Sequence, residues 1–559
     1  MPDYTRDQPK ELALPPRLPL IGIPNQRGAS AARDSRLVNG YVEFGQDEVL
    51  RIVKRPGLTV KYTLDGYGAG LFGNYSVFYE QTSESIATGR LCFDGTSTVT
   101  IDTHSVIGIS ERFFSFVDAP TGLDTEVLFF HNTYFVYAWD GATLKVVQSA
   151  DQTIGPLTCS ITNGSTAVTT ATTANLTQYS SVSGTGITAG TYIQSIDSST
   201  AFTLSAAATA TNASAALDFV TAGPPYKDGV SPSSVKQFVH GVAVLNKAVY
   251  LFSTQSKVAG ADPDAPLAWQ PLNFLFAYVE QDAPVAFTRQ LTHVVALKST
   301  STEFFRDAGN SPGSPLERVE GQHLDVGCYN GRTVQSIDGV LLWVSNTESG
   351  LRSVYSMERL RATEIATPAV RRALESLAPT YAISFSLSGH SFYVVTDPTA
   401  GVSLVYDLSS KLWYYWNALG STYFPFTAAT YVEGETRLQH ESNGKIYVFD
   451  LDAVDDAGSD IVMDIFPPQF DANTRLSKTI SRMHLVADQQ PGSTLLVRTN
   501  DADQATGEWT NWRMFDLSQE RPTLSNCGSF SRRFYHFRHQ ARTPCRLTAV
   551  ELELLVGTL

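Results

Sequence analysis

The sequence predicts an all-β protein with a β-propeller-like core, an inserted small β-sandwich (Ig-like) domain and an extended N-terminal arm. Only 17% of the 559 residues are charged, whereas Tyr, Phe, Thr and Val are frequent, which is typical of β structure. Short apolar runs alternate with turns that contain Gly or Asp. One internal segment, residues 155–217, has a different composition from the remainder.

The propeller is predicted by a pattern that recurs along the chain. An apolar strand is followed by a short polar turn, an aromatic-rich strand, and then Asp-Gly or Asp-Leu. Variants of this pattern are "VYAWDGATLKV" from Val136, "YVFDLD" from Tyr447 and "VYDLSSKLWYYW" from Val405. Repeated four-stranded units of about 40–60 residues indicate propeller blades, which must pack in a ring because one sheet cannot bury both its faces. A set of unrelated β-sandwiches is the alternative.

Composition divides the chain into five regions. They are an arm (1–35), the first blades (36–154), the insertion (155–220), the remaining blades (221–460) and a C-terminal β domain or closing blade (461–559). The Pro-rich arm is expected to cross to a neighbouring molecule. The insertion is rich in Thr, Ser, Ala and Gly but keeps strand alternation in "TAVTT" and "AFTLSA", so we expect a folded domain in a propeller loop.

Two segments allow detailed predictions. In "ATPAVRRALESLAPT", Thr367 can cap a helix that starts at Pro368 and stops before Pro379. Its apolar face is Val370, Leu374 and Leu377. In the aromatic stretch 391–416, strand alternation places Leu404 and Tyr406 on one face and Val405 on the other. The aromatic residues there should fill both faces of one blade rather than form a ligand platform.

Bulk properties exclude several classes of protein. A net charge of −14 argues against broad binding to duplex phosphate, which needs clustered Lys and Arg. The five cysteines are far apart and show no C-x-x-C spacing, so a zinc ribbon or redox motif is excluded and a reducing compartment of synthesis fits. The sequence contains no run of about 18 apolar residues, so no membrane span is predicted.

The sequence predicts no catalytic residue, no cofactor and no metal site. It lacks G-x-S-x-G, a P-loop, H-E-x-x-H and a dinucleotide fingerprint. His536 and His539 would point to opposite faces of a strand. The carboxylates of "DLDAVDDAGSD" (450–460) and "NDADQATGEW" (500–509) are interpreted as solvated turns, because the second lacks the Gly and Glu of a calcium loop.

Two Arg clusters, each near aromatic residues, are the candidate functional residues. Arg with interleaved aromatic residues can hold single-stranded nucleic acid, but the same residue types are enriched at subunit interfaces. The acidic net charge favours an interface. The candidate interface residues are Arg359, Arg361, Arg371, Arg372, Arg532, Arg533 and Arg538.

Several motifs in this order resemble a known family. They are "SRLVNGYVE" with "KRPGL" (35–58), "STEFFRDAGNSPGSPLERVEGQHLDVGCYNGRTVQSIDGVLLWVS" from Ser301, "ATEIATPAVRRAL" from Ala362, and "GHSFYVVTDPTAGVSLVYDLSSKLWYYW" from Gly389. The chain resembles the tail hub and nozzle family of short-tailed bacteriophages (podoviruses), which includes packaged-DNA stabilisation proteins and tubular tail proteins. The resemblance covers most of the chain except 155–217.

The resemblance implies a structural virion protein without enzymatic activity, made in the cytoplasm of a host bacterium. It implies a ring-shaped homo-oligomer of six copies below the portal and adaptor, with tail fibres or spikes as further partners. Packaged DNA would be retained and then conducted through the ring without sequence-specific binding. A weakly charged or acidic wall suits such a channel, because basic residues would hold the phosphates.

Two alternatives belong to another class of protein. The first is a carbohydrate-binding or sialidase-like β-propeller, which would use the Tyr and Trp residues as stacking platforms and require acidic pairs at one end of the ring. The second is a sugar-binding role for the insertion alone.

Overall fold

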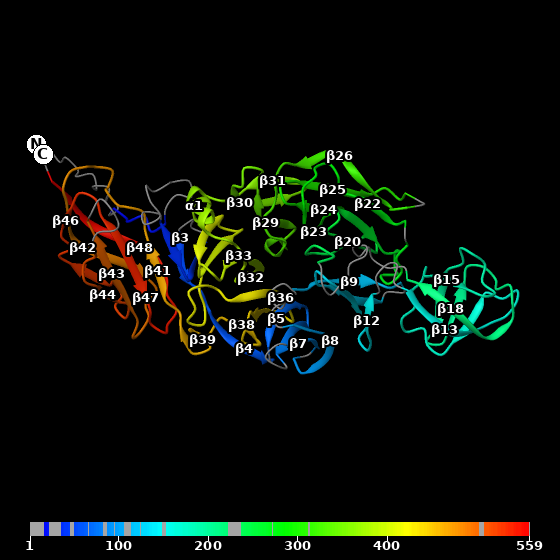
Figure 1. Cartoon of the computed structure of the whole chain (residues 1–559). Coiled ribbons are helices and arrows are strands. Elements are labelled where there is room, and N and C mark those ends of the chain that lie inside the picture. Colours follow the sequence, from blue (N-terminus) through cyan, green and yellow to red (C-terminus); the bar gives the residue numbers. More distant parts are fainter. Residues whose placement is uncertain are drawn as a thin grey trace, which may run out of the picture.

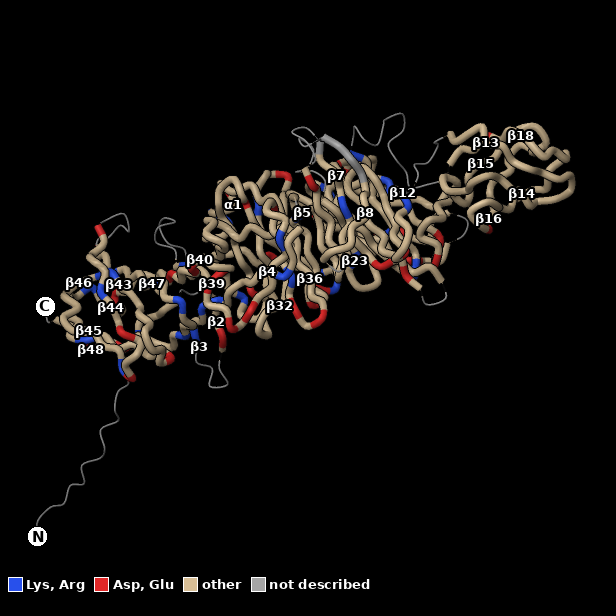
Figure 2. Tube along the Cα trace, turned by 90° about the horizontal axis from the view of Figure 1, so that it is seen from below, with Lys and Arg blue, Asp and Glu red and all other residues tan. Residues whose placement is uncertain are grey.

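Nearly all the regular structure of the chain is β-strand. The computed structural model describes residues 16–21, 35–44, 50–64, 66–81, 86–93, 95–105, 113–122, 125–147, 153–221, 236–270, 272–310, 313–501 and 508–557. Figure 1 shows three parts in a row: a sandwich built from both ends of the chain, a propeller in the middle, and the insertion at the far end. The view from below in Figure 2 shows the same elongated arrangement.

The propeller has seven blades among the described residues, each an antiparallel sheet. Blades 1 and 2 are β5 (Tyr67–Phe72), β6 (Tyr75–Gln81), β7 (Ile86–Phe93) and β8 (Ser97–Ser105), then β9 (Ser115–Pro120), β10 (Glu126–His131), β11 (Val136–Trp139) and β12 (Leu144–Val147). Blades 3 and 4 are β19 (Ala243–Leu245), β20 (Ala248–Phe252), β21 (Lys257–Gly260) and β22 (Phe274–Phe276), then β23 (Pro284–Gln290), β24 (His293–Lys298), β25 (Thr302–Asp307) and β26 (Leu316–Leu324).

Blades 5 to 7 follow blade 4 and complete the ring. Blade 5 is β27 (Gly327–Cys328), β28 (Gln335–Ile337), β29 (Val340–Asn346), β30 (Arg352–Glu358) and β31 (Arg361–Glu364), with the 3₁₀ turn η3 (Gly331–Thr333) interrupting its innermost strand. Blade 6 is β32 (Tyr381–Leu387), β33 (His390–Asp397), β34 (Val402–Asp407) and β35 (Leu412–Tyr415). Blade 7 is β36 (Phe426–Val432), β37 (Glu435–His440), β38 (Lys445–Asp450) and, from the other end of the chain, β4 (Gly57–Thr63).

The ring is closed by a strand from early in the chain. β4 pairs antiparallel with β38, so blade 7 is completed by residues nearly 400 positions away. The innermost strands β36 and β5 then contact each other, which joins blade 7 to blade 1. The predicted all-β, propeller-containing fold is confirmed.

The aromatic stretch in blade 6 contributes to two separate cores, as predicted. Tyr393, Leu404 and Tyr406 pack toward blade 5, whereas Val405 and Tyr414 pack into the core that reaches the sandwich. All five side chains are buried. Trp413 and Tyr415 of the same blade are half-buried and pack against the core shared with blade 5.

The predicted helix is α1 (Pro368–Ser376). The side chain of Thr367 accepts a hydrogen bond from the Val370 amide at 3.4 Å, and Pro368 occupies the first turn. Val370 and Leu374 are buried against blades 5 and 6.

The sandwich combines strands from both ends of the chain. One sheet has the order β2 (Gly40–Phe44), β3 (Leu50–Lys54), β48 (Arg546–Val556), β42 (Lys478–Ala487), β45 (Thr523–Ser525), with β46 (Ser529–Phe530) also on β42. The other continues blade 6 outward from β35 through β1 (Arg36–Val38), β41 (Met463–Phe466), β47 (Phe534–His539), β43 (Thr494–Asn500) and β44 (Arg513–Asp516). β1 and β3, expected among the first blades, therefore pair with the C-terminal strands β41 and β48, because the apolar faces of β1–β3 complete the sandwich core.

The described part of the N-terminal arm packs on its own chain. β3 pairs with only the first part of β48, and Pro16–Leu18 extends along the remainder of that edge. The Leu18 amide donates to the Val550 carbonyl at 2.9 Å, and the Leu552 amide donates to Pro16. Leu18 and Leu20 are buried in the sandwich core, unlike the expectation that the arm leaves its own chain. The rest of the arm lies outside the described residues.

The insertion is a single curled sheet rather than the two separate sheets of a sandwich. Its strand order is β15 (Ser181–Gly184), β18 (Asn212–Val220), β13 (Thr153–Ile161), β14 (Ala167–Thr170), β17 (Ala201–Leu204) and β16 (Ile193–Ser198). A bridge between Ser181 and Tyr192 joins the two edges of this sheet. Register shifts in the β13–β18 pair bend it around its own apolar core, in the way that bulges curve a sheet.

Candidate functional site

Two arginines of the cluster 532–538, which lies in and just before β47, are held by carboxylates. Arg533 is buried and binds Asp501 with two hydrogen bonds of 2.6 and 2.9 Å. Arg538 binds Asp464 in the same bidentate way, at 2.7 and 3.0 Å. Burial opposes the charge of Arg533, but the Asp501 contact outweighs it and raises the pKa of that guanidinium. Arg533 is therefore a structural residue, whereas Arg538 is one-third exposed.

Arg538 belongs to a larger group on the outer face of the sandwich, which we call the Arg–Trp face. Strand alternation turns Tyr535 and Phe537 inward and leaves His536 and Arg538 outward. The Arg–Trp face consists of Arg36, Asp464, Phe466, Arg498, Trp509, Trp512, His536 and Arg538. Of these, only Arg538 was predicted, because the others come from segments scattered over the whole chain.

Arginines and rings interleave on the Arg–Trp face. The Arg498 guanidinium lies 5.0 Å from the Trp509 ring and 4.5 Å from the Trp512 ring. The Arg36 guanidinium lies 4.1 Å from the centroid of the Phe466 ring. The His536 ring stacks on the Phe466 ring at a centroid distance of 4.0 Å. Such cation–π contacts help to hold the guanidinium groups in place.

Hydrogen bonds on this face require a neutral His536. Its Nδ1 accepts from Arg498 Nε at 3.0 Å, so its Nε2 carries the proton and donates to Asp464 at 2.8 Å. Burial lowers the pKa of His536, in spite of the neighbouring carboxylate. Burial would raise the pKa of Asp464, but the hydrogen bonds from His536 and Arg538 keep it below its usual range. Three arginines thus face one carboxylate, and the face carries a net positive charge.

The other Arg cluster lies on blade 5 and α1. Arg359 and Arg361 are exposed at the β30–β31 turn and make no ion pair within the described ranges. Arg371 on α1 lies 3.6 Å from Glu364, and Arg372 beside it is partly exposed. The two predicted clusters are therefore not one site, since one lies on the propeller and one on the sandwich.

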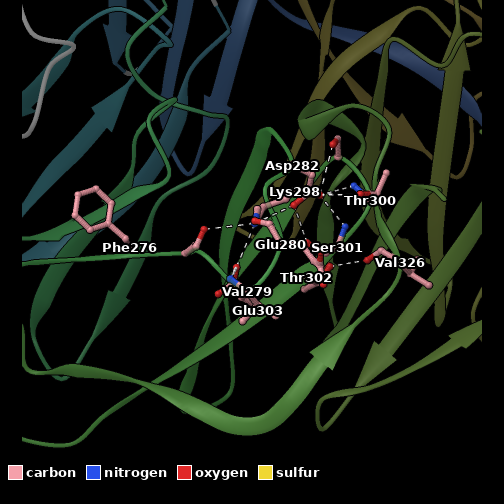
Figure 3. A network of polar contacts seen from close by, with 12 residues as sticks. Phe276, Val279, Glu280, Asp282, Lys298, Thr300, Ser301, Thr302, Glu303 and Val326 are labelled. Carbon is pink, nitrogen blue, oxygen red and sulfur yellow. Dashed lines mark hydrogen bonds and ion pairs between the residues drawn. The ribbon is translucent and has the colours of Figure 1, made fainter. Parts of the chain in front are cut away.

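The motif beginning "STEFF" forms a buried charge network in blade 4 (Figure 3). Lys298, at the end of β24, is fully buried and lies 2.8 Å from Asp282 and 3.2 Å from Glu303. Asp282 also accepts the amides of Thr300 and Ser301 at 2.7 and 3.0 Å. Burial opposes ionisation, but these donors lower the pKa of Asp282 to about 2. Every charge in the network has a partner, so it stabilises the β24–β25 turn rather than offering a reactive group.

The "VNG" and "KRPGL" motifs meet where the propeller joins the sandwich. Arg55 is buried and binds Asp456 through Nη1 at 2.8 Å and Nη2 at 2.5 Å. Its Nε donates to the Asn39 side chain at 3.3 Å, and Nη2 also reaches the Asn417 carbonyl. A Cβ on Gly57 would lie 2.1 Å from the Asp455 carbonyl oxygen, so this approach requires glycine. We call this set the sandwich joint.

The axis of the propeller is filled by side chains from several blades. Arg332, in η3, lies 3.1 Å from the Phe113 ring and 5.2 Å from the Tyr381 ring. Tyr381 donates to Glu441 at 2.9 Å. Burial lowers the pKa of Arg332 to about 9 and that of the adjacent His240 to about 3. A polymer such as duplex DNA cannot pass through this axis.

The carboxylate-rich segments do not gather into a metal site. Within the described ranges, no group of three or more His, Cys, Asp or Glu side chains is placed to hold a metal ion. Asp455 and Asp460 bind Arg542, and Asp501 binds Arg533. Asp503 lies outside the described residues. Among the described residues, no helix has the length and apolar character needed to cross a membrane.

Comparison with known proteins gives one informative match. Residues 264–454, about a third of the chain, match a family model described as "Bacteriophage P22 Gp10, beta-propeller". This range runs from blade 3 through blades 4, 5, 6 and 7 and includes the blade-4 network. The match supports a structural protein of a podovirus tail or stabilisation family. No curated protein matches the chain.

Solved structures resemble the chain only loosely. BamB from Moraxella catarrhalis is 10% identical with a TM-score of 0.32, over 71% of this chain and 99% of that chain. The dihydro-heme d1 dehydrogenase NirN, in complex with DHE, has the same identity and TM-score over 88% of this chain and 82% of its own. Scores this low support no inference about function.

Proposed function

We propose that the chain is a hub or nozzle subunit of a short phage tail. Six copies form a ring below the portal and adaptor, which retains packaged DNA, conducts it on infection and binds fibres or spikes. The observation that carries this proposal is the family match of residues 264–454. The role is structural, because it requires only surfaces that bind neighbouring proteins and a fixed shape.

The filled propeller axis bears on where the DNA would run. Arg332, Phe113 and Tyr381 close the centre of each propeller, so the channel must lie between copies. A ring of acidic subunits suits this role, because their net charge of −14 each gives DNA phosphates little to bind.

The Arg–Trp face is the best candidate for a contact between copies. It is positively charged on a strongly acidic chain, and it presents Trp512 and Arg498, residue types that dominate the energetics of interfaces. An acidic surface of a neighbouring copy is its natural complement. The exposed Arg359 and Arg361 on blade 5 offer a second, smaller contact.

Electron microscopy of the full chain mixed with its own portal and adaptor tests the proposal. We expect rings on the portal complex, with a density-free path between copies. The variant Arg498→Gln with Trp512→Ala should reduce ring formation, whereas Arg482→Gln, an exposed arginine on the other sheet of the sandwich, should not. Monomers under every condition would contradict the ring. Rings that form equally well with the double variant would rule out the Arg–Trp face as the contact.

A further inference from the structure

A cavity of about 920 Å³ lies where the insertion meets blades 2 and 3. The insertion supplies the loop 172–178 and the turn 195–199. Blade 2 supplies β12 and its preceding turn, and blade 3 supplies residues 264–268. Figure 1 shows β12 beside the insertion at this end of the propeller. The volume is in the range of sites for small organic ligands.

The lining residues indicate the chemistry of a ligand. Eight of the 22 lining residues carry a hydroxyl group and two carry an amide. Only Lys145 and Asp264 are charged, and Figure 2 shows how few charged residues the insertion has as a whole. A phosphate or nucleic acid would need clustered cations, and a lipid would need a continuous apolar wall. Neither is present, whereas neutral donors and acceptors suit an uncharged, hydroxyl-rich ligand.

Asp264 is the one carboxylate among the lining residues, and its side chain is one-third exposed. Its Oδ2 lies 3.2 Å from the exposed ammonium of Lys247. Its Oδ1 is buried and receives no hydrogen bond within the described part of the chain. A ligand in the cavity cannot reach the buried Oδ1, so the exposed part of the carboxylate, which carries Oδ2, is the acceptor available to a ligand hydroxyl.

The walls of the cavity are held together before any ligand binds. Tyr179 of the insertion donates to Asp262 of blade 3 at 2.6 Å, and Gln270 donates to the other oxygen of Asp262 at 2.8 Å. We call these contacts the insertion joint. Because the joint fixes both walls, a ligand that spans them would bind a largely formed site.

We propose that this cavity binds a neutral oligosaccharide. The hydroxyl and amide side chains, with Asp264, would bind the sugar hydroxyls. Leu144, Ile196 and Leu267 would contact the apolar C–H faces of the rings. The site differs from a propeller that uses aromatic platforms, since none of its 22 lining residues is aromatic. It adds a ligand to a protein whose proposed role is structural.

Binding of the full chain to an array of bacterial oligosaccharides tests this proposal. The array should carry neutral O-chain fragments of lipopolysaccharide, neutral capsular fragments and acidic capsular fragments in separate sets. We expect binding to neutral fragments, and the set that binds identifies their source. Binding to none, or to acidic fragments only, would overturn the proposal. None of these three outcomes depends on whether the chain forms rings.

Two pairs of variants locate the binding site. Ala174→Trp fills the cavity, and its control Ala167→Trp places the same side chain on an exposed strand position of the insertion away from it. Asp264→Asn keeps a residue that tolerates the positive φ of that position, with the exposed Asp218→Asn as control. We expect roughly tenfold or greater loss of affinity for Ala174→Trp and Asp264→Asn, as for loss of a hydrogen bond to a charged group. Equal affinity in variants and controls, with unchanged melting temperatures, would place the sugar elsewhere.

Discussion

The propeller is joined to the sandwich at one end and to the insertion at the other, and the two joints consist of different kinds of contact. At the sandwich joint a nine-stranded sheet runs without a break from blade 6 into the sandwich, and Arg55 and Asp456 are buried beside it. At the insertion joint, Tyr179 and Gln270 bind Asp262 next to an open cavity. Burial and complete pairing fix the first joint, whereas the second depends on a few polar contacts close to solvent.

The difference indicates which parts must keep their relative position. A buried ion pair gains little stability over apolar residues, but it allows only the arrangement in which each charge has its partner. At the sandwich joint, Arg55 has four acceptors from both ends of the chain, so the sandwich has one orientation. The insertion can vary without disturbing that geometry.

The largest expected effect is the loss of the buried cation at the sandwich joint. Arg55→Met leaves Asp456 buried and unpaired and removes the donors to Asn39 and Asn417. We expect the free energy of unfolding to fall by about 3–5 kcal/mol, measured by urea unfolding followed by tryptophan fluorescence. The control is Arg542→Met, which removes a half-exposed cation near the same Asp455–Asp460 turn and should have a much smaller effect, because solvent screens exposed ion pairs. Equal effects would mean that burial does not distinguish the two ion pairs.

Acid should weaken the propeller by a smaller amount through blade 4. The pKa of Asp282 is about 2 in the folded chain, below its ordinary value of 3.8. The folded state therefore gains stability from Asp282 above pH 4, and loses it as the pH falls through 4 toward 2. The shift corresponds to about 2 kcal/mol. Asp282→Asn should lower stability at pH 6 and flatten its decline between pH 4 and 2. A decline as steep as that of the unmodified chain would assign the acid sensitivity to other groups.

Local features of the fold could be read from the sequence. Thr367, Pro368 and the spacing of Val370 and Leu374 define α1, because capping and helical periodicity act over a few residues. Alternation in 402–407 gave the correct faces of β34 for the same reason. Two of the motifs that resemble phage tail proteins contribute buried charges that have partners, Arg55 in the sandwich joint and Glu303 in blade 4.

Long-range pairing could not be read from the sequence. β4 closes blade 7, and β1 joins blade 6 to the sandwich, through contacts between residues hundreds of positions apart. Strand patterns indicate which face is buried but not which strand lies alongside. For the same reason the sequence could not predict that Arg498 and Trp512 lie together, since only the pairing of β43 with β47 and β44 brings them close. The cavity likewise requires three segments that are distant in sequence.

Removal of the insertion should have the smallest effect on the stability of the propeller. Thr153 pairs with Val220, so the two ends of this domain lie side by side and a short Gly-Ser link can replace residues 153–220. The core shared by blades 2 and 3 contains no insertion residue. The deletion therefore removes only the insertion joint from the propeller. The unfolding free energy of the propeller should change by less than about 1 kcal/mol. Combining the deletion with Arg55→Met should give the sum of the two effects, because the two joints lie at opposite ends of the propeller and share no contact. A large loss on deletion, or strong coupling to Arg55→Met, would mean that the two joints are not independent.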